Sequence, residues 1–212
     1  MSSLAQLVKR VSKQKHGFKL IEKEAEYLVA DSGPAESYAI AMELFQSDQY
    51  QARALATFIL SRLSVNSPAA LQFLREEVSR DESWQVQEIL AKAFDQYCKD
   101  SGYENALPVI KDWLKDKNPN VRRAVTEGLR IWTGKPYFKD HPEVAVRLLA
   151  SHKDDESEYV RKSAGNALRD ISKKYPELVR AELKNWDVSE KKVQQTYKLA
   201  SRFLNKETEK KS

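Results

Sequence analysis

A helix-pair pattern recurs four times along this chain and constrains its fold more than any other feature. In each unit, the second helix is expected to open with an acidic turn and a small or apolar residue followed by a polar one. That polar residue is Arg53, Gln87, Arg122 and Arg161 in turn, at steps of 34, 35 and 39 residues. Self-similarity at this period, with one helix pair per unit, indicates an α-solenoid.

The turn-Val-Arg element, followed by a ladder of alanine or leucine, resembles HEAT repeats. We therefore predict an all-α protein, an α-solenoid of HEAT-like helix pairs of the armadillo type, with a concave groove of basic and mixed charge. One domain is expected over residues 1–204, followed by a charged, disordered tail at 205–212. Its parts are predicted as N-terminal helices within 3–29, repeats at roughly 34–63, 68–98, 103–132 and 142–174, and a cap at 176–204.

Composition narrows the function classes. Only 6 Gly and 7 Pro are present, too few for the many turns of an all-β protein. The net charge of +5 is compatible with a polyanionic partner, while 31 acidic residues argue against a simple cationic arm. A single cysteine, Cys98, excludes an intramolecular disulfide and favours a reducing compartment. Without a signal peptide or an apolar run of ~20 residues, we expect a cytoplasmic protein that does not associate with membranes.

The repeat register predicts which side chains share the inner face. The position two after the Val is Ala54, Glu88, Arg123 and Lys162 in successive units, so these residues are expected side by side. The groove should therefore be mixed in charge, with the carboxylate of Glu88 beside an arginine of the next repeat. One and two helical turns further along, the stripe continues with Lys92, Asp95, Glu127, Arg130, Asn166 and Arg169.

Trp84 and Glu88 are the unusual residues of this stripe. They lie four apart at the start of a helix, so both side chains project from nearly the same face. Glu88 has two interpretations. It forms an ion pair with Arg123 that holds adjacent repeats together, or it is a catalytic carboxylate beside an exposed aromatic residue. Trp84 is correspondingly a ligand platform or a packing residue. The sequence leaves both alternatives open.

Residues 132–139 form the longest interruption of the pattern and account for the 39-residue step. This segment interleaves Trp132, Tyr137 and Phe138 with lysines such as Lys135. Such a composition suits base stacking and phosphate contact, or equally a packed connector. Gly165 lies inside a predicted helix at a cost of roughly 1 kcal/mol relative to alanine, so we expect a close approach there, by a ligand or by a packed helix.

Other chemistries find no support in the sequence. The three histidines, His16, His141 and His152, are far apart and fall in loops or at helix ends, which suggests neither a metal cluster nor a histidine-based dyad. There is no phosphate-cradling Gly-rich loop and no nucleophile elbow. We therefore expect no metal and no cofactor.

Three segments in order on successive repeats carry a resemblance to a known family: residues 84–88, 118–123 and 160–170. They resemble the HEAT-like-repeat alkylpurine DNA glycosylases of the AlkC and AlkD superfamily, and the run from Ser83 to Val179 is especially similar to the AlkC branch. The resemblance implies a monomeric DNA repair enzyme that excises cationic alkylated bases, such as 3-methyladenine, from duplex DNA. It implies hydrolysis of the N-glycosidic bond without a metal or cofactor.

The resemblance also implies roles for residues. Trp84 would lie against the deoxyribose of the damaged nucleotide, Glu88 would stabilise the oxocarbenium-like sugar and position water, and Arg123 would hold the DNA backbone. The AlkD branch has Asp where this chain has Glu88, and a second tryptophan where it has Asn166, so Trp132 is a candidate substitute. Together with the register, this predicts DNA contacts by Lys92, Arg130, Trp132, Lys135, Lys162, Asn166 and Arg169.

A non-catalytic HEAT scaffold that binds DNA or a protein in the same groove is the alternative. Glu88 separates the two hypotheses, because a carboxylate at the centre of a pure phosphate-binding surface would repel the DNA backbone. The sequence therefore favours the enzyme.

Overall fold

The prolines mark where helices begin. Six of the seven prolines occupy the first position of a helix, and Pro108 occupies the second position of another. Proline is tolerated there because the first backbone N–H groups of a helix have no intrahelical partner. The residues that would break a helix interior thus serve as start signals for the helix pairs.

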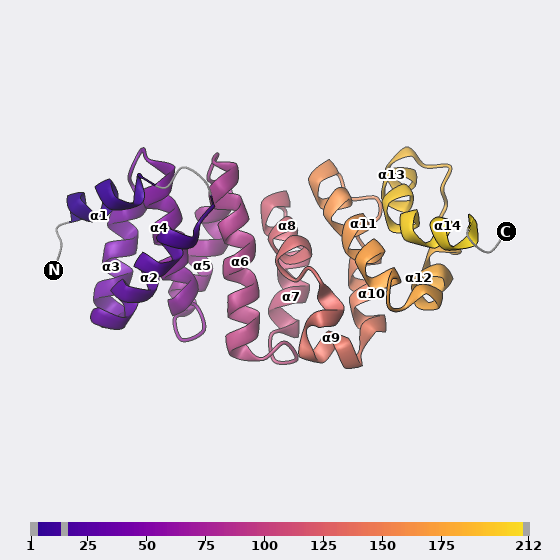
Figure 1. The fold of residues 1–212 in the computed structure, drawn as a ribbon, viewed down its shortest axis with the longest axis horizontal. Helices are drawn as coiled ribbons and strands as arrows, with labels where there is room; N and C mark the ends of the chain where they lie inside the picture. The colour runs from indigo at the N-terminus through magenta and orange to yellow at the C-terminus, as the bar shows by residue number, and fades with distance from the viewer. Residues whose placement is uncertain (1–3, 14–16, 210–212) are drawn as a thin grey trace. The chain divides into compact units, whose positions relative to one another are not determined.

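The computed structural model describes residues 4–13 and 17–209, with side chains through Asn205. The described part is all-helical and has a HEAT-like repeat fold, as predicted (Figure 1). Its α-helices are α1 Leu4–Val11, α2 Lys19–Asp31, α3 Pro34–Phe45, α4 Tyr50–Leu63, α5 Pro68–Glu76, α6 Trp84–Ser101, α7 Leu107–Leu114, α8 Pro119–Gly128, α9 Pro136–Asp140, α10 Pro142–Ala150, α11 Glu158–Ser172, α12 Pro176–Leu183, α13 Lys191–Ala200 and α14 Arg202–Glu209. Two short 3₁₀ helices are η1 Val78–Arg80 and η2 Trp132–Gly134.

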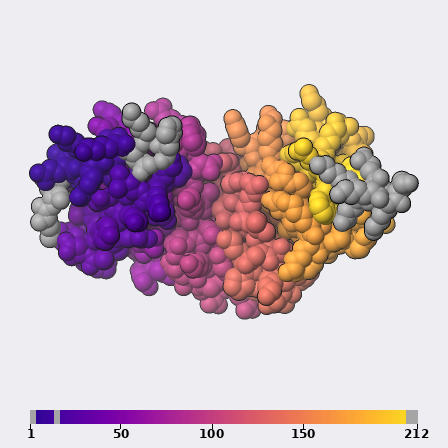
Figure 2. Space-filling model, viewed as in Figure 1, coloured from indigo at the N-terminus to yellow at the C-terminus, as the bar shows by residue number. Residues whose placement is uncertain are grey.

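The chain divides into two compact units, Met1–Ser101 and Gly102–Ser212. In the first unit α4 is the central helix, packed against α2, α3, α5 and α6. Nearly every residue of α4 is buried, which requires the small and aliphatic side chains that its sequence supplies on all sides. Helices α1 and α2 cross in front of this layer, and their atoms cover its viewer-facing side (Figures 1 and 2).

The burial of α4 corrects one expectation. Ala54 was expected on an open inner face, yet it is fully buried in α4. Because α4 packs against α2, α3, α5 and α6, this first position is not part of the accessible stripe. The accessible part of the stripe in the first unit therefore begins with α6.

In the second unit α11 is the central helix, packed against α8, α10, α12 and α13. Gly165 makes the packing on α13 possible. A Cβ placed on Gly165 would lie 2.9 Å from the Cβ of Leu199 and 3.0 Å from the carbonyl oxygen of Thr196. The close approach expected at this glycine is therefore made by a helix.

The polar residue that defines the repeat ties each second helix to its own turn, and where it is an arginine it also contacts the next helix pair. Arg53 donates to the carbonyl oxygens of Ser47 and Asp48, at 2.9 and 3.0 Å, and pairs with Asp81 in the turn before α6. In the second unit Arg122 repeats this arrangement with Asp155, and Arg161 reaches Gln195. Gln87 keeps the turn contacts, donating to the carbonyl oxygens of Val78 and Asp81. The sequence period thus has a hydrogen-bonding cause.

Helix α8 ends at Gly128 and is followed by η2 and α9, so the segment 132–139 lies in two short helices. Residues 205–209 are part of α14, and the last three residues of the expected tail lie outside the described part of the chain. The disorder of this tail stays a prediction. The extent of the domain stays a prediction.

Candidate nucleic-acid interface

The first turn of α6 presents an aromatic ring to solvent. Trp84 is the first residue of this helix and is 67% exposed, whereas Val86, Ile89 and Leu90 on the opposite side are fully buried. The helical spacing explains the difference, because residues 84 and 88 lie on one side and the apolar residues of the same two turns on the other. Trp84 is therefore a surface residue, and the packing interpretation does not hold in this structure.

A polar network fixes the turn that carries Trp84. The guanidinium of Arg53 donates to the carboxylate of Asp81 at 2.6 and 3.2 Å. Asp81 in turn accepts a hydrogen bond from the backbone N–H of Ser83 at 2.8 Å, and its carbonyl oxygen accepts one from Gln87 at 2.8 Å. Since these groups lie just before α6 and in its first turn, they set the direction in which the helix starts.

Glu88 lies one turn after Trp84 and is half-buried, and Lys92 lies one turn further and is exposed. The ammonium group of Lys92 sits 5.9 Å from the ring centre of Phe18, which precedes α2. The three residues therefore follow one another along a single accessible stripe of α6. An ion pair between Glu88 and Arg123 stays a prediction, because these residues belong to different units.

In the second unit the predicted residues fall on α8 and α11. Arg123 and Asn166 are half-buried, and Lys162 is exposed and pairs with Glu158 at 2.6 Å. Both side chains of this pair are more than half exposed, so solvent screens their attraction and the lysine can exchange partners at little cost. Lys162 and Asn166 share one side of α11, as the repeat register predicted.

Arg130 and Arg169 meet at a carboxylate that the predicted set did not contain. Asp170 accepts contacts from Arg130 at 3.2 Å and from Arg169 at 3.3 Å. Burial raises the pKa of Asp170, but the contacts with Lys173 and Arg130 outweigh this and hold the pKa below its usual value. The pKa of Arg130 is raised, because hydrogen bonds to Glu127 and Asp170 outweigh the effect of burial.

Trp132 is not a groove residue, which corrects the prediction that it contacts DNA. Its indole is fully buried, with its ring centre 4.9 Å from that of Phe138, and its N–H donates to the carbonyl oxygen of Thr126 at 3.4 Å. Trp132 and Phe138 are therefore core residues of this connector, which packs beside α10. Lys135 remains near the surface, with its ammonium group 5.7 Å from the ring centre of Tyr103.

The structure shows an exposed aromatic that the sequence prediction missed. Tyr159, in the first turn of α11, is 73% exposed and lies on the same side of the helix as Lys162. Its signal was present in the repeat register, because it directly precedes Val160, the apolar residue of the turn element. The predicted stripe starts two residues after the Val in each unit and so does not include this position.

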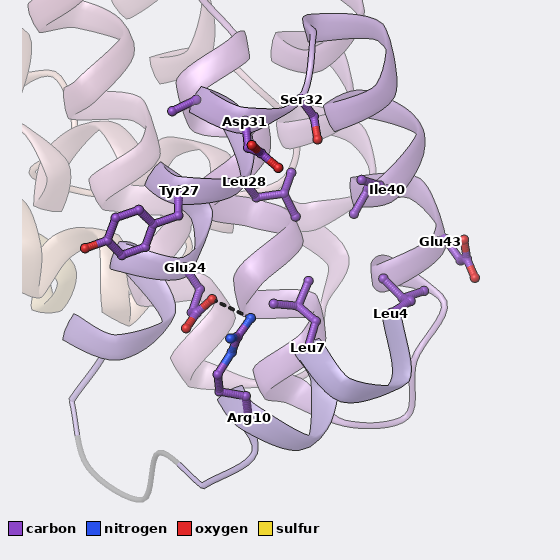
Figure 3. Close-up of a pocket in the computed structure, with 11 residues that line it drawn as sticks. Leu4, Leu7, Arg10, Glu24, Tyr27, Leu28, Asp31, Ser32, Ile40 and Glu43 are labelled. Carbon is purple, nitrogen blue, oxygen red and sulfur yellow. Dashed lines mark ion pairs between the residues drawn. The ribbon is translucent and has the colours of Figure 1, made fainter. Parts of the chain in front are cut away.

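A cavity of about 540 Å³ opens between α1, α2 and α3 in the first unit (Figure 3). Leu7, Leu28 and Ile40 point into it, and the ion pair of Arg10 with Glu24, 3.0 Å long, lies at its edge. None of the predicted site residues lines it. The cavity is therefore separate from the predicted stripe of α6.

Within the described residues, 4–13 and 17–209, no three His, Cys, Asp or Glu side chains gather as a metal site would require. No helix in the same ranges combines the length and apolar character needed to cross a membrane.

The fold belongs to a class of HEAT-like-repeat proteins that includes DNA repair enzymes. The chain is a member of the DNA alkylation repair enzyme family, which matches residues 17–207. In particular, it is 52% identical to AlkD2 from Streptococcus mutans, with a TM-score of 0.92 over 94% of this chain and 96% of that chain. It is also 39% identical over 87 residues to the uncharacterized protein YhaZ of Bacillus subtilis (strain 168), a match that covers 39% of this chain and 24% of YhaZ.

The structural similarities correct the branch inferred from the motifs. The alkylpurine DNA glycosylase AlkC from Pseudomonas fluorescens, bound to DNA containing an abasic site analog, is 23% identical, with a TM-score of 0.51 over 96% of this chain and 64% of that chain. The chain is therefore much closer to AlkD2 than to AlkC. A TOG-domain structure of Crescerin, 14% identical with a TM-score of 0.58 over 94% of this chain and 89% of that chain, shares the fold alone.

Proposed function

We propose that this chain excises cationic alkylated bases of the 3-methyladenine type from duplex DNA by hydrolysing the N-glycosidic bond. Membership of the DNA alkylation repair enzyme family supports the substrate class. The observation that carries the proposal is the exposed Trp84 one helical turn before Glu88 on α6. No metal or cofactor is required by this chemistry, and the protein is proposed to act as a monomer.

The reaction needs little help at the leaving group. An alkylated purine already carries a positive charge, so it leaves with the electron pair of the C1′–N bond and becomes neutral. Positive charge then develops on the deoxyribose ring, and a carboxylate fixed beside the sugar stabilises it. Glu88 supplies that carboxylate and positions the water that adds to C1′, and the proton of this water passes to solvent.

Trp84 complements this role. Its exposed ring offers a flat apolar surface for the sugar of the damaged nucleotide, and the network from Arg53 through Asp81 holds the turn in place. A backbone turn held in position before the substrate arrives loses little conformational entropy on binding. Arg123 and Lys162, with Lys92, Lys135 and Asn166, are proposed to contact the DNA backbone.

The experiment is release of 3-methyladenine from methylated duplex DNA by the wild type, Glu88→Gln and Glu82→Gln. The control, Glu82, is an exposed carboxylate two residues before α6. Loss of one electrostatic stabiliser of the transition state lowers a rate by roughly 10²–10³-fold, so Glu88→Gln should fall by that factor while Glu82→Gln keeps wild-type activity. Equal activity of all three proteins would refute the role of Glu88.

A second candidate function is damage recognition without excision. The burial of Trp132 favours it, because the residue expected to replace the second tryptophan is unavailable to a sugar, and Asn166 offers no ring. In that case the wild type would bind methylated duplex DNA but release no base. The same assay therefore separates the two functions, provided that binding is measured in parallel by fluorescence anisotropy.

A further inference from the structure

Three cations at the C-terminal ends of α8 and α11 in the second unit surround one carboxylate. The carboxylate of Asp170 lies 3.2 Å from Arg130, 3.3 Å from Arg169 and 2.8 Å from Lys173. Arg130 follows α8, Arg169 lies in the last turn of α11, and Lys173 directly follows that helix. One aspartate thus gathers positive charge from two repeats at a single place.

The cluster keeps an excess of positive charge. Its second carboxylate, Glu127, pairs with Arg130 at 3.1 Å and accepts a hydrogen bond from Ser163 at 2.9 Å. Three cations therefore share two carboxylates. Asp170 itself is almost fully covered, whereas the side chains of Arg130, Arg169 and Lys173 are 39%, 22% and 54% exposed, so each cation of the cluster reaches solvent more than Asp170 does.

We propose that Arg130, Arg169 and Lys173, held together by Asp170, bind a phosphodiester group of duplex DNA. The proposal rests on the DNA-binding function proposed above and adds Lys173 and Asp170, which the sequence did not single out. Asp170 acts as a positioning residue, since it contacts the cations and not the DNA.

The chemistry of the cluster fits a phosphodiester. A guanidinium has five N–H donors, and the contacts of Arg130 with Asp170 and Glu127 use two of them, which leaves donors for a further anion. Guanidinium groups match the oxygen pair of a phosphate, and a lysine adds a point charge. Because Asp170 already restrains the three long side chains, less rotamer entropy is lost when they engage the DNA.

The alternative is that the cluster only stabilises the packing of α8 against α11. In that case its removal would lower the free energy of unfolding and leave DNA binding unchanged, so the two roles can be measured separately. Lys173 is the most informative position, because its exposed side chain can be replaced with little effect on folding. Lys184, exposed at the end of α12, offers a matched control with the same change of charge.

The test measures binding of undamaged duplex DNA by the full chain as a function of salt concentration for wild type, Lys173→Gln, Arg130→Gln and Lys184→Gln. Each phosphate contact contributes about 0.9 to the slope of log K against log salt. We expect Lys173→Gln and Arg130→Gln each to reduce the slope by about 0.9 and to weaken binding about eightfold at 0.1 M salt. Lys184→Gln should keep the wild-type slope.

An unchanged slope for Lys173→Gln, or an equal reduction for Lys184→Gln, would overturn the site. A free phosphate ion offers the same chemistry, so inorganic phosphate is titrated into the wild type and Lys173→Gln. Phosphate binding that depends on Lys173, together with an unaltered DNA slope, would also overturn the assignment to DNA. Arg130→Gln is interpreted only if its unfolding transition shows that it folds.

The two proposals fail separately. If base release depends on Glu88 but the salt slopes of the variants do not change, the proposed phosphate site is wrong and the proposed glycosylase activity is kept. If the slopes change as expected but the wild type releases no base, the phosphate site stands and the excision function is wrong.

Discussion

Arg122 and Asp155 are joined by two parallel hydrogen bonds, both 2.7 Å long, between a guanidinium and a carboxylate that are almost entirely buried. Arg122 also donates to the carbonyl oxygens of Asp116 and Lys117. One side chain therefore stabilises the turn before its own helix and contacts the next repeat. Asp155 further accepts the backbone N–H of Ser157 at the start of α11. The stability of the second unit should therefore depend strongly on this pair.

Replacement of Asp155 by Asn should lower the free energy of unfolding by about 2–4 kcal/mol, because it leaves the buried charge of Arg122 without its partner. Urea denaturation followed by circular dichroism measures the change. Glu158→Gln is the control, since the pair of Glu158 with Lys162 is exposed and screened, and no measurable loss is expected there. Equal effects of the two changes would contradict the structural role of the buried pair.

The same carboxylate predicts an acid dependence of stability. Burial raises the pKa of Asp155, but hydrogen bonds from His152 and Arg122 outweigh it and hold the pKa well below its ordinary value. A carboxyl whose pKa is lower in the folded state stabilises the protein at any pH above its unfolded pKa of about 3.9. This stabilisation is lost as the pH falls through the folded pKa. As the pH is lowered below about 5, the urea concentration at the unfolding midpoint should therefore decrease, and it should decrease less steeply for Asp155→Asn than for the wild type. An equally steep decrease in the variant would show that Asp155 is not the source of this pH dependence.

Gly165→Ala should destabilise the protein, although alanine is the better helix former by roughly 1 kcal/mol. The added Cβ would meet the Cβ of Leu199 at 2.9 Å and a backbone oxygen at 3.0 Å, and the backbone cannot rotate away. Overpacking of this kind costs about 1–3 kcal/mol, measured as a lower melting temperature. Gly134→Ala is the control, because nothing lies within 4 Å of a Cβ at that position.

Two tryptophans should respond in opposite ways. Trp84→Ala should leave the unfolding free energy within about 0.5 kcal/mol of wild type and reduce base release and binding of methylated DNA, since the ring is exposed. Trp132→Ala should cost about 3–5 kcal/mol, since its ring is fully buried against Phe138. Thermal unfolding and the base-release assay, run on both variants, separate the two roles. A strongly destabilised Trp84→Ala would remove it from the candidate site.

The predicted repeat pattern was confirmed in the helices because its causes are local. The step between Arg53, Gln87, Arg122 and Arg161 reflects a turn contact made within a few residues, and proline placement fixes where helices begin. Tyr159 and Asp170 also lay in this register, yet a pattern of residue types does not tell which polar or aromatic side chains are left exposed. The roles of Glu88 and Arg123 in DNA chemistry stay predictions.

By itself the sequence determined the helical repeat, the register that puts Trp84, Glu88 and Lys92 on one side of a helix, and the family resemblance, because periodicity and turn chemistry depend on neighbours along the chain. Only the tertiary structure decided that Trp84 is exposed, that Ala54 and Trp132 are buried, and that Asp170 gathers Arg130, Arg169 and Lys173. Those outcomes depend on which helices pack together, and burial and charge pairing between repeats arise from contacts that no local pattern specifies.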